Sequence, residues 1–418
     1  GSWMRLFFIA SSVVVVHLAG QFLRRQALVH VELYHIILVV TAGFMLLVQS
    51  HHFVSLFVCL ETVTIAFYVL AAYKRDSRFS LEAGLKYLVM GGLSSGILLF
   101  GITLLYGAAS NPLLPGTATS PLAFADLAVF IESADEFYNN RSSWLVIFGA
   151  VLVLCGVAFK IGLVPFQIWI PDVYQGAPTP VTALLAVSSK AAGFVILYLL
   201  LDGPFASLET VTVPLLGTVA VLTLLFGNLA ALGQRNVKRL IGLSGVSHAG
   251  ILLMGLLASL SVDWALLAVF FYLVVYAIAS LGVFGVMVHL SGQADEQQEF
   301  DDYDDLLKRN PFLGTVLLVS LGSLAGIPPL AGFVAKLLVF VAAFEAGLYI
   351  PLTAALFGVV ISIYYYFGWM RAAVGHNAFL EKPISQVIEG PAFGGRVILL
   401  SLATASVVLG LYQGLFPF

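Results

Sequence analysis

Four charged side chains lie inside long apolar segments of the sequence, where a charge is costly unless it has a task. Glu61 stands near the middle of one apolar segment, and Lys160 follows sixteen uncharged residues. Lys190 and Lys336 lie within two further segments. In a membrane each such charge costs about 2.5–3.5 kcal/mol, so the four together cost on the order of 10 kcal/mol. That cost rivals the stability of a typical fold and predicts that these charges face the interior and have a function.

Proton transfer is the chemistry that these residue types favour. A desolvated lysine without a fixed anion loses its proton more readily than in water, so it can accept a proton and pass it on. The alternative is an ion pair between Glu61 and Lys160 that only holds two helices together. Such pairs stabilise poorly compared with apolar packing, and this one leaves Lys190 and Lys336 without an intramembrane acid. The pattern therefore predicts a proton relay.

Two further residues are candidates for the same relay. His248 carries an imidazole that titrates near neutral pH, although a lone helical histidine is more often a packed residue. Lys86 lies one turn inside a predicted helix end, where snorkelling of its ammonium to the membrane surface explains it equally well. The run Tyr364–Tyr366 is interpreted as packing and an interfacial belt.

The composition places the chain in a membrane. Hydrophobic residues make up 60% of the 418 residues and charged residues only 10%, against about 25% charged residues in soluble proteins. A helix that crosses a bilayer needs about 20 mostly apolar residues. Such segments occur at 5–22, 31–49, 52–72, 83–107, 144–164, 178–201, 212–232, 239–258, 263–290, 312–347 (interrupted), 352–371 and 395–415. The sequence thus predicts an all-α polytopic membrane protein with about twelve transmembrane helices.

Glycine and proline interrupt two of these helices, at 160–165 and at 325–336. Proline lacks a backbone donor and clashes with the preceding turn, and the freed carbonyl groups must meet protein or water. Two broken helices in corresponding halves of a chain are typical of inverted repeats with ion sites at the breaks. The expected organisation is an N-terminal helix at 1–30, half-repeats at 31–201 and 202–371, and a C-terminal helix at 372–418.

The basic residues sort by side of the membrane. Of the 19 lysines and arginines, three lie within the membrane, Arg5 and Arg141 lie on or beside one face, and all the others lie on or beside the opposite face. The positive-inside rule makes that opposite face cytoplasmic, so both termini are expected outside. The connection 292–311, with seven of the 22 acidic residues, is expected to be a solvated loop. The connection 108–143 is expected to carry a short helix at 121–131 on the outer surface.

No pattern in the sequence predicts a cofactor or metal site in this chain. It contains no P-loop, no glycine-rich turn between a strand and a helix, and no CxxC pair. Cys59 and Cys155 are too far apart in sequence to form an iron–sulfur or zinc site unaided, and we expect both to pack. The energy for moving ions must then come from an ion gradient or from another subunit.

The stretch GVAFKIGLVPFQIWIPDVYQGAPTPVTALLAVSSKAA, at 156–192, resembles the signature of subunit N of bacterial NADH–quinone oxidoreductase (respiratory complex I), the counterpart of mitochondrial subunit 2. Stretches at 60–88, 236–250 and 323–336 follow in the order of that family. The run PDVYQGAP, at 171–178, is particular to subunit N rather than to its sister subunits L and M.

This resemblance implies an antiporter-like subunit that translocates protons and contacts sister and small membrane subunits in a bacterial inner membrane. The site residues that it implies are a coupling pair Glu61 and Lys160, a central relay lysine Lys190, a terminal Lys336, and His248 and Lys86 on the same axis. NADH, FMN, iron–sulfur clusters and quinone would belong to partner subunits, with no cofactor in this chain. The family has fourteen helices, so a twelve-helix chain is expected to lack the first two, through a short gene or a fragment.

Two other functions stay open at this point. One is a subunit of a multi-subunit sodium–proton antiporter, driven by the gradient alone. The other is a purely structural membrane subunit, in which replacing Lys336 would leave the proton stoichiometry unchanged. The run DVYQGAPTPV favours the redox-driven pump. The residues do not specify the electron donor, the quinone or whether sodium is carried.

Overall fold

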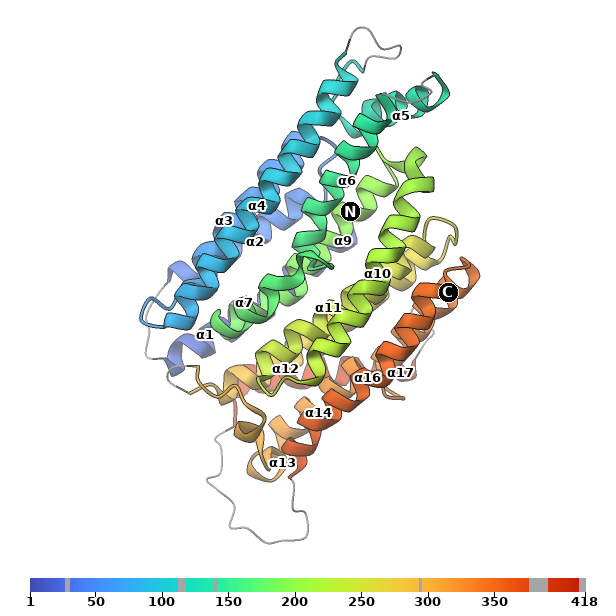
Figure 1. Cartoon of the computed structure of the whole chain (residues 1–418). Helices are drawn as coiled ribbons and strands as arrows, with labels where there is room; N and C mark the ends of the chain where they lie inside the picture. The colour runs from blue at the N-terminus through green and yellow to red at the C-terminus, as the bar shows by residue number, and fades with distance from the viewer. Residues whose placement is uncertain (27–30, 112–117, 138–141, 293–294, 376–389, 413–418) are drawn as a thin grey trace.

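The computed structural model describes residues 1–26, 31–111, 118–137, 142–292, 295–375 and 390–412. Across these ranges the chain is a bundle of helices that run side by side, without strands apart from two isolated bridges (Figure 1). The main helices of the bundle are α1 (Ser2–Arg25), α2 (Glu32–Leu47), α3 (Phe53–Ala71), α4 (Arg78–Ala109), α6 (Ser142–Ile161), α9 (Lys190–Leu201), α10 (Glu209–Leu232), α11 (Val237–Ala258), α12 (Ala265–Leu290), α14 (Pro311–Ala325), α15 (Ala331–Glu345), α16 (Tyr349–Val374) and α17 (Phe393–Leu411).

Shorter elements complete the described chain. They are α5 (Phe124–Phe137), α7 (Ile170–Gly176), α8 (Thr179–Leu184), α13 (Leu306–Arg309), the 3₁₀ turns η1 (Phe166–Trp169), η3 (Ala206–Leu208) and η4 (Phe300–Tyr303), and a π-helical turn η2 (Leu185–Ser189). The surface helix expected at 121–131 is present as α5, displaced by a few residues toward the C-terminus.

The predicted number of membrane crossings is confirmed. Among the described residues, ten helical spans are long and apolar enough to cross a membrane, with α6 to α7 and α8 to α9 each counted as one span. Two shorter apolar helices, α2 and α14, add two crossings, and α15 continues α14 beyond its break. Helices suit this environment because their backbone groups are satisfied within the element.

Polar caps set where several helices begin. The Asn236 side chain accepts hydrogen bonds from the backbone of Lys238 and Arg239 at the start of α11. The Asn310 side chain does the same for Leu313 at the start of α14, where proline occupies the first helical position. These side chains satisfy backbone donors that have no partner inside the helix.

Helix α11 forms the centre of the bundle. All of its residues are buried except the partly exposed Arg239, and it packs on α7, α10, α12, α15 and α16. Helices α3 and α4 lie along one edge and α17 lies toward the other, as Figure 1 shows. The edge helices expose large apolar side chains such as Val58, Leu93 and Leu400, which suits contact with lipid or an apolar partner.

One end of the bundle carries the α3–α4, α10–α11 and α12–α14 connections, and α5 lies at the opposite end (Figure 1). We call the former the basic end, because it holds the described lysines and arginines that were predicted to share one face. Arg141 and Lys382 lie outside the described residues. The expectation that 292–311 is a solvated loop is wrong in part, because Asp295 is 7% exposed and Tyr303 is fully buried.

Candidate functional site: a row of buried lysines

Lys160 lies in the last turn of α6, buried against α3. Its ammonium donates a hydrogen bond of 2.5 Å to Thr64 Oγ1, and it lies 5.5 Å from the centroid of the Phe159 ring. The Glu61 carboxylate, one turn before Thr64, accepts a hydrogen bond of 2.5 Å from Ser95 Oγ on α4. The ion pairs of the described chain do not include Glu61 with Lys160. The structure thus places Glu61 on α3 one turn from the threonine that holds Lys160 of α6, and a hydroxyl holds each member of the predicted pair.

A small cavity adjoins the Lys160 ammonium. It measures about 20 Å³, counted as the space open to the centre of a water molecule, and it is lined by Thr64, Tyr87, Lys160, Ser189 and Gly193 among others. About 10–15 Å³ of such space is enough for one water with polar partners. The cavity therefore links the side chain of Lys160 to the helical turn that precedes Lys190.

The break after Lys160 depends on one glycine. Gly162 has φ +82°, and its N–H bonds to the carbonyl oxygens of Ala158 and Phe159. The second break has the same pattern, because Gly326 has φ +83° and its N–H bonds to the carbonyl oxygens of Gly322 and Ser323. Residues with a side chain pay about 1–2 kcal/mol in this left-handed region. Each break is thus a glycine-terminated helix end.

Lys190 stands directly after the π-helical turn η2 and is 3% exposed. Its ammonium donates to the backbone oxygen of Gly245 at 2.5 Å and to Tyr276 Oη at 3.3 Å. A β-carbon at Gly245 would lie 2.8 Å from the ammonium nitrogen, so the missing side chain makes room for it. Single π-turns inside α-helices occur frequently at functional sites.

His248 is hydrogen-bonded at both ring nitrogens. Its Nδ1 lies 2.7 Å from Tyr272 Oη on α12, and its Nε2 lies 3.2 Å from Tyr366 Oη on α16. The ring of Tyr276 lies 5.1 Å from the imidazole ring, centroid to centroid. A neutral imidazole donates at one nitrogen and accepts at the other, and a hydroxyl does both. The Tyr272–His248–Tyr366 chain can therefore carry its protons in two directions.

Lys336, 5% exposed, caps the broken end of α14. Its ammonium donates to the carbonyl oxygens of Leu324 and Ala325, at 2.8 and 2.9 Å. These carbonyls lie at a helix C-terminus, where the helix dipole favours a cation. A β-carbon on Gly326 would lie 3.0 Å from the Lys336 side chain. The second break thus creates the site that its lysine occupies.

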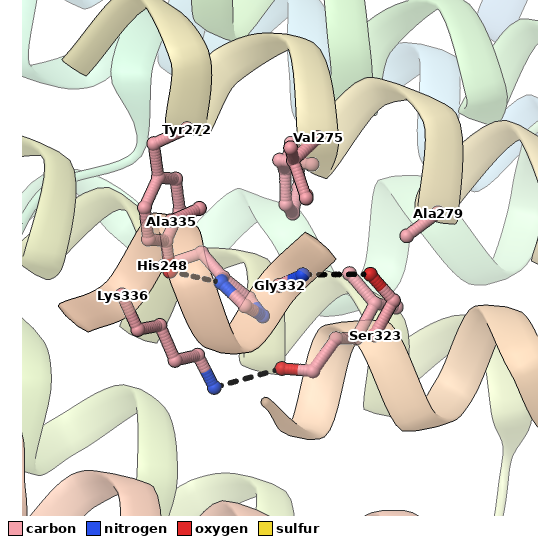
Figure 2. Close-up of a pocket in the computed structure, with 10 residues that line it drawn as sticks. His248, Tyr272, Val275, Ala279, Ser323, Gly332, Ala335 and Lys336 are labelled. Carbon is pink, nitrogen blue, oxygen red and sulfur yellow. Dashed lines mark hydrogen bonds between the residues drawn. The ribbon is translucent and has the colours of Figure 1, made fainter. Parts of the chain in front are cut away.

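A second small cavity, of about 10 Å³ on the same scale, separates His248 from Lys336. Figure 2 shows both side chains on the wall of this pocket, with Tyr272 bonded to His248 and Ser323 bonded to the backbone of Gly332. Tyr276, which contacts Lys190, lines the same pocket. Tyr276, His248 and Lys336 thus line one small internal space, and Lys190 is hydrogen-bonded to the first of them.

Lys86 lies apart from this buried row, at the basic end. Its ammonium forms ion pairs with Glu82 and Asp172, both at 2.6 Å, and its side chain is 42% exposed. Asp172 also accepts a hydrogen bond of 2.7 Å from Arg239. The structure therefore joins Lys86 to α7 and α11 through Asp172, rather than to the other predicted relay residues directly.

A buried ion pair lies nearby at the basic end. Lys238 donates to Asp295 at 2.6 Å, with side chains that are 1% and 9% exposed. The carboxylate also accepts from Thr179 Oγ1 at 2.8 Å, and the ammonium also donates to the backbone oxygen of Ala177 at 3.0 Å. In the adjoining α3–α4 connection, burial lowers the pKa of Lys74, although the nearby Asp295 carboxylate acts in the opposite direction.

Several residues of this site escaped the sequence reasoning. Thr64 and Ser95 hold the two members of the predicted pair, and Asp172 holds Lys86. Tyr366 was assigned to packing, yet its hydroxyl contacts His248, whereas Tyr364 of the same run is 72% exposed. Hydroxyl residues at these positions have no distinctive spacing. The position of Thr64 one helical turn after Glu61 was the only available signal.

The comparisons with known proteins agree with this architecture. The family described as "NADH:quinone oxidoreductase/Mrp antiporter, TM" matches residues 50–362. The chain is 56% identical to NADH-quinone oxidoreductase subunit N 1 of Opitutus terrae, with 99% of this chain and 81% of that protein covered.

Two solved structures resemble the chain along nearly its whole length. A chain of respiratory complex I from Thermus thermophilus has a TM-score of 0.78 and 30% identity, over 99% of this chain and 84% of that one. A chain of the Mrp complex from Dietzia has a TM-score of 0.77, over 99% of this chain and 81% of that one, but at 20% identity it shows only the fold. The family match covers most of this chain, and the protein therefore belongs to the NADH:quinone oxidoreductase/Mrp antiporter family of transmembrane subunits.

Proposed function

We propose that this chain is the antiporter-like, proton-translocating membrane subunit of a redox-driven NADH–quinone oxidoreductase. The observation that carries the proposal is the set of partners of Lys160, Lys190 and Lys336. All three ammonium groups are buried, and their described hydrogen bonds go to neutral oxygens. A buried lysine without an anion can exist in either protonation state, which suits a carrier of protons better than a structural tie.

The proposed path follows the row of lysines. Protons enter at the basic end, pass from Lys160 to Lys190 and then to Lys336, and leave at the opposite end. The two small cavities lie on the intervals between these lysines and have space for about one water each. In the second interval, Tyr276 and His248 supply further groups that can donate and accept a proton.

Glu61 is the proposed switch for Lys160. When its carboxylate turns toward the ammonium, the opposite charge favours the protonated lysine; when it turns away, the proton is released to the next acceptor. The hydrogen bonds from Ser95 to Glu61 and from Lys160 to Thr64 correspond to the separated arrangement. A change of charge in a neighbouring subunit would select between the two. Lys86, with Asp172, is proposed to lie on the entry side of the same path.

The chain is proposed to hold no redox cofactor, so that NADH, FMN, iron–sulfur clusters and quinone would bind to partner subunits. The bacterial relative from Opitutus is named as a subunit of such an oxidoreductase. A bacterial inner membrane is the proposed location, with the basic end in the cytoplasm and both termini outside. Sister antiporter-like subunits and small membrane subunits are the proposed neighbours.

We also propose that the chain is built from two inverted half-repeats, 31–201 and 202–371, preceded by a helix at 1–30 and followed by one at 372–418. The two broken spans support this division. The span α6–α7 ends at the basic end, whereas α14–α15 starts there, and each contains a glycine-terminated break with the same backbone hydrogen bonds. Two spans that cross the membrane in opposite directions and have the same local structure are typical of an inverted repeat.

The test is Lys336→Met, measured in the purified, fully assembled complex. We expect electron transfer to quinone to continue while this chain's share of the protons per electron is lost, because methionine cannot carry a proton. Leu337→Met, on the exposed side of the same helix, is the control and should pump normally. An unchanged proton stoichiometry in assembled Lys336→Met would contradict the proposal and favour a structural subunit.

The same preparation separates the pump from the antiporter. Co-purification with flavin- and iron–sulfur-bearing subunits and quinone reductase activity is expected for the pump. Companions limited to small membrane subunits, together with sodium–proton exchange in vesicles, would instead assign the chain to a sodium–proton antiporter.

A further inference from the structure

Asn228 of α10 is a fully buried amide in the membrane-spanning bundle, and the proposed lysine path does not use it. Its Nδ2 donates to the backbone oxygen of Leu224 at 2.8 Å and to Ser247 Oγ on α11 at 2.6 Å. Its Oδ1 accepts from Tyr365 Oη on α16 at 3.2 Å. A buried amide without partners is costly, and here every polar atom of the side chain has one. Asn228 therefore joins three helices at one point.

The residues that Asn228 holds are the chain neighbours of two relay groups. Ser247 directly precedes His248, and Tyr365 directly precedes Tyr366. The His248 imidazole and the Tyr366 hydroxyl then meet at 3.2 Å. Asn228 thus contacts the residue before each end of this hydrogen bond, and the distance between α11 and α16 at this level depends on its two contacts.

Two glycines make room for this arrangement. A β-carbon at Gly358 of α16 would lie 2.4 Å from Asn228 Nδ2, and one at Gly227 of α10 would lie 2.6 Å from the backbone nitrogen of Ser247. Close helix approach at small residues is a common way of fixing helices in membranes. The amide and both glycines therefore fix the positions of α10, α11 and α16 relative to each other.

We propose that Asn228 is a positioning residue for the proton relay: through Ser247 and Tyr365 it keeps His248 and Tyr366 in hydrogen-bond contact. This rests on the proposed function, because it matters only if protons pass His248. With Tyr272 at Nδ1 and Tyr366 at Nε2, the imidazole plane is fixed toward the cavity that it shares with Lys336. Loss of the Tyr366 contact allows the imidazole ring to rotate away from this cavity.

The experiment compares Asn228→Leu and Tyr365→Phe in the assembled complex with Thr218→Val. Leucine has the same branching as asparagine but makes no hydrogen bond. Phenylalanine removes only the Tyr365 hydroxyl that donates to Asn228 Oδ1, so Tyr365→Phe still tests the proposal if the leucine variant does not assemble. Thr218 lies on the exposed side of α10 and bonds only within its own helix, so the control should pump like the parent. We expect each test variant to lower the proton-pumping rate per electron about 2- to 10-fold, as loss of one or two hydrogen bonds implies.

A double-mutant comparison with His248→Gln separates positioning from general loosening. In the His248→Gln background, Tyr365→Phe should cause no further loss, because its effect acts through the histidine. If Tyr365→Phe causes the same loss in the His248→Gln background as in the parent, the positioning role of Asn228 is overturned, while the relay through His248 stands. Normal pumping in both Tyr365→Phe and Asn228→Leu would have the same consequence. If His248→Gln itself pumps normally in the assembled complex, the relay through His248 fails, and the role of Asn228 fails with it.

Discussion

Asp295 shows that the stability of one end of the bundle can depend on a single loop residue. It lies in a connection rich in acidic residues, yet its carboxylate is buried between Lys238 and Thr179. Removal of one member of a buried ion pair leaves the other charge without compensation, which costs far more than loss of an exposed pair. The basic end of the bundle thus depends on one carboxylate that composition alone would assign to solvent.

Asp295→Asn is therefore expected to destabilise the protein by about 3–5 kcal/mol, because it leaves the Lys238 ammonium buried without an anion. Asp305→Asn is a matched control. Asp305 also has a positive φ, 55° against 60° at Asp295, and it pairs with Lys308 in an exposed position, so its loss should cost no more than about 1 kcal/mol. Thermal unfolding of both variants in detergent measures the difference, and equal melting temperatures would argue against the buried pair.

At the level of single residues, the sequence identified three buried lysines but not what they touch. Lys160, Lys190 and Lys336 stood out because a cation in an apolar segment is rare and costly. Their partners are Thr64, the Gly245 carbonyl and the carbonyls at the end of α14. Hydroxyls and backbone oxygens occur in every helix, so only the packing of α3, α11 and α14 selects them.

The helical elements combine long regular spans with a few irregular turns at which the lysines lie. Lys160 precedes one glycine-terminated break, Lys190 follows a π-turn, and Lys336 caps the second break. Regular helix hides its backbone oxygens in its own hydrogen bonds, whereas a break frees them. The second break therefore supplies the oxygens that hold Lys336, whereas Lys160 and Lys190 bond to groups of the regular helices α3 and α11.

Gly326→Ala tests this dependence. Alanine at φ +83° costs about 1–2 kcal/mol, and its β-carbon would lie 3.0 Å from the Lys336 side chain, which must move. We expect a lower proton-pumping rate per electron in the assembled complex. Gly92→Ala, in the middle of α4 with open space around it, should pump normally and gain up to about 1 kcal/mol of helix stability. If Gly326→Ala and Gly92→Ala lost pumping to the same extent, the helices would instead be sensitive to any added side chain at a glycine position.

Most of the helices could be predicted from the sequence, because a run of about 20 apolar residues indicates a transmembrane helix. Both breaks could also be predicted, from Gly162 with Pro165 and from Gly326 with two prolines. The π-turn η2 could not be predicted. Its residue Ser188 is hydrogen-bonded to Ser11 of α1 at 2.9 Å, a contact across 177 residues of sequence that no local pattern contains.

For the whole molecule, the asymmetry of charge between the two ends predicts its orientation. We propose that the basic end faces the cytoplasm. After replacement of Cys59 and Cys155, a single cysteine at Arg75 or at Ser261 reports the two sides, because both residues are exposed in connections at opposite ends. A membrane-impermeant maleimide should label Ser261→Cys in intact spheroplasts and Arg75→Cys only in inverted membranes. The reverse pattern would overturn the proposed orientation.

The contact between Thr179 and Asp295 can form only late in the synthesis of the chain. The two residues are 116 positions apart, and a ribosome adds about 5–20 residues per second. Thr179 therefore waits about 6–23 s for its carboxylate, while every helix from α8 to α12 enters the membrane. Lys238 waits for about half that interval, 57 residues. The nascent chain thus holds an unpaired cation at its basic end until α12 is complete, and the carboxylate closes that end before α14, α15 and Lys336 have been made.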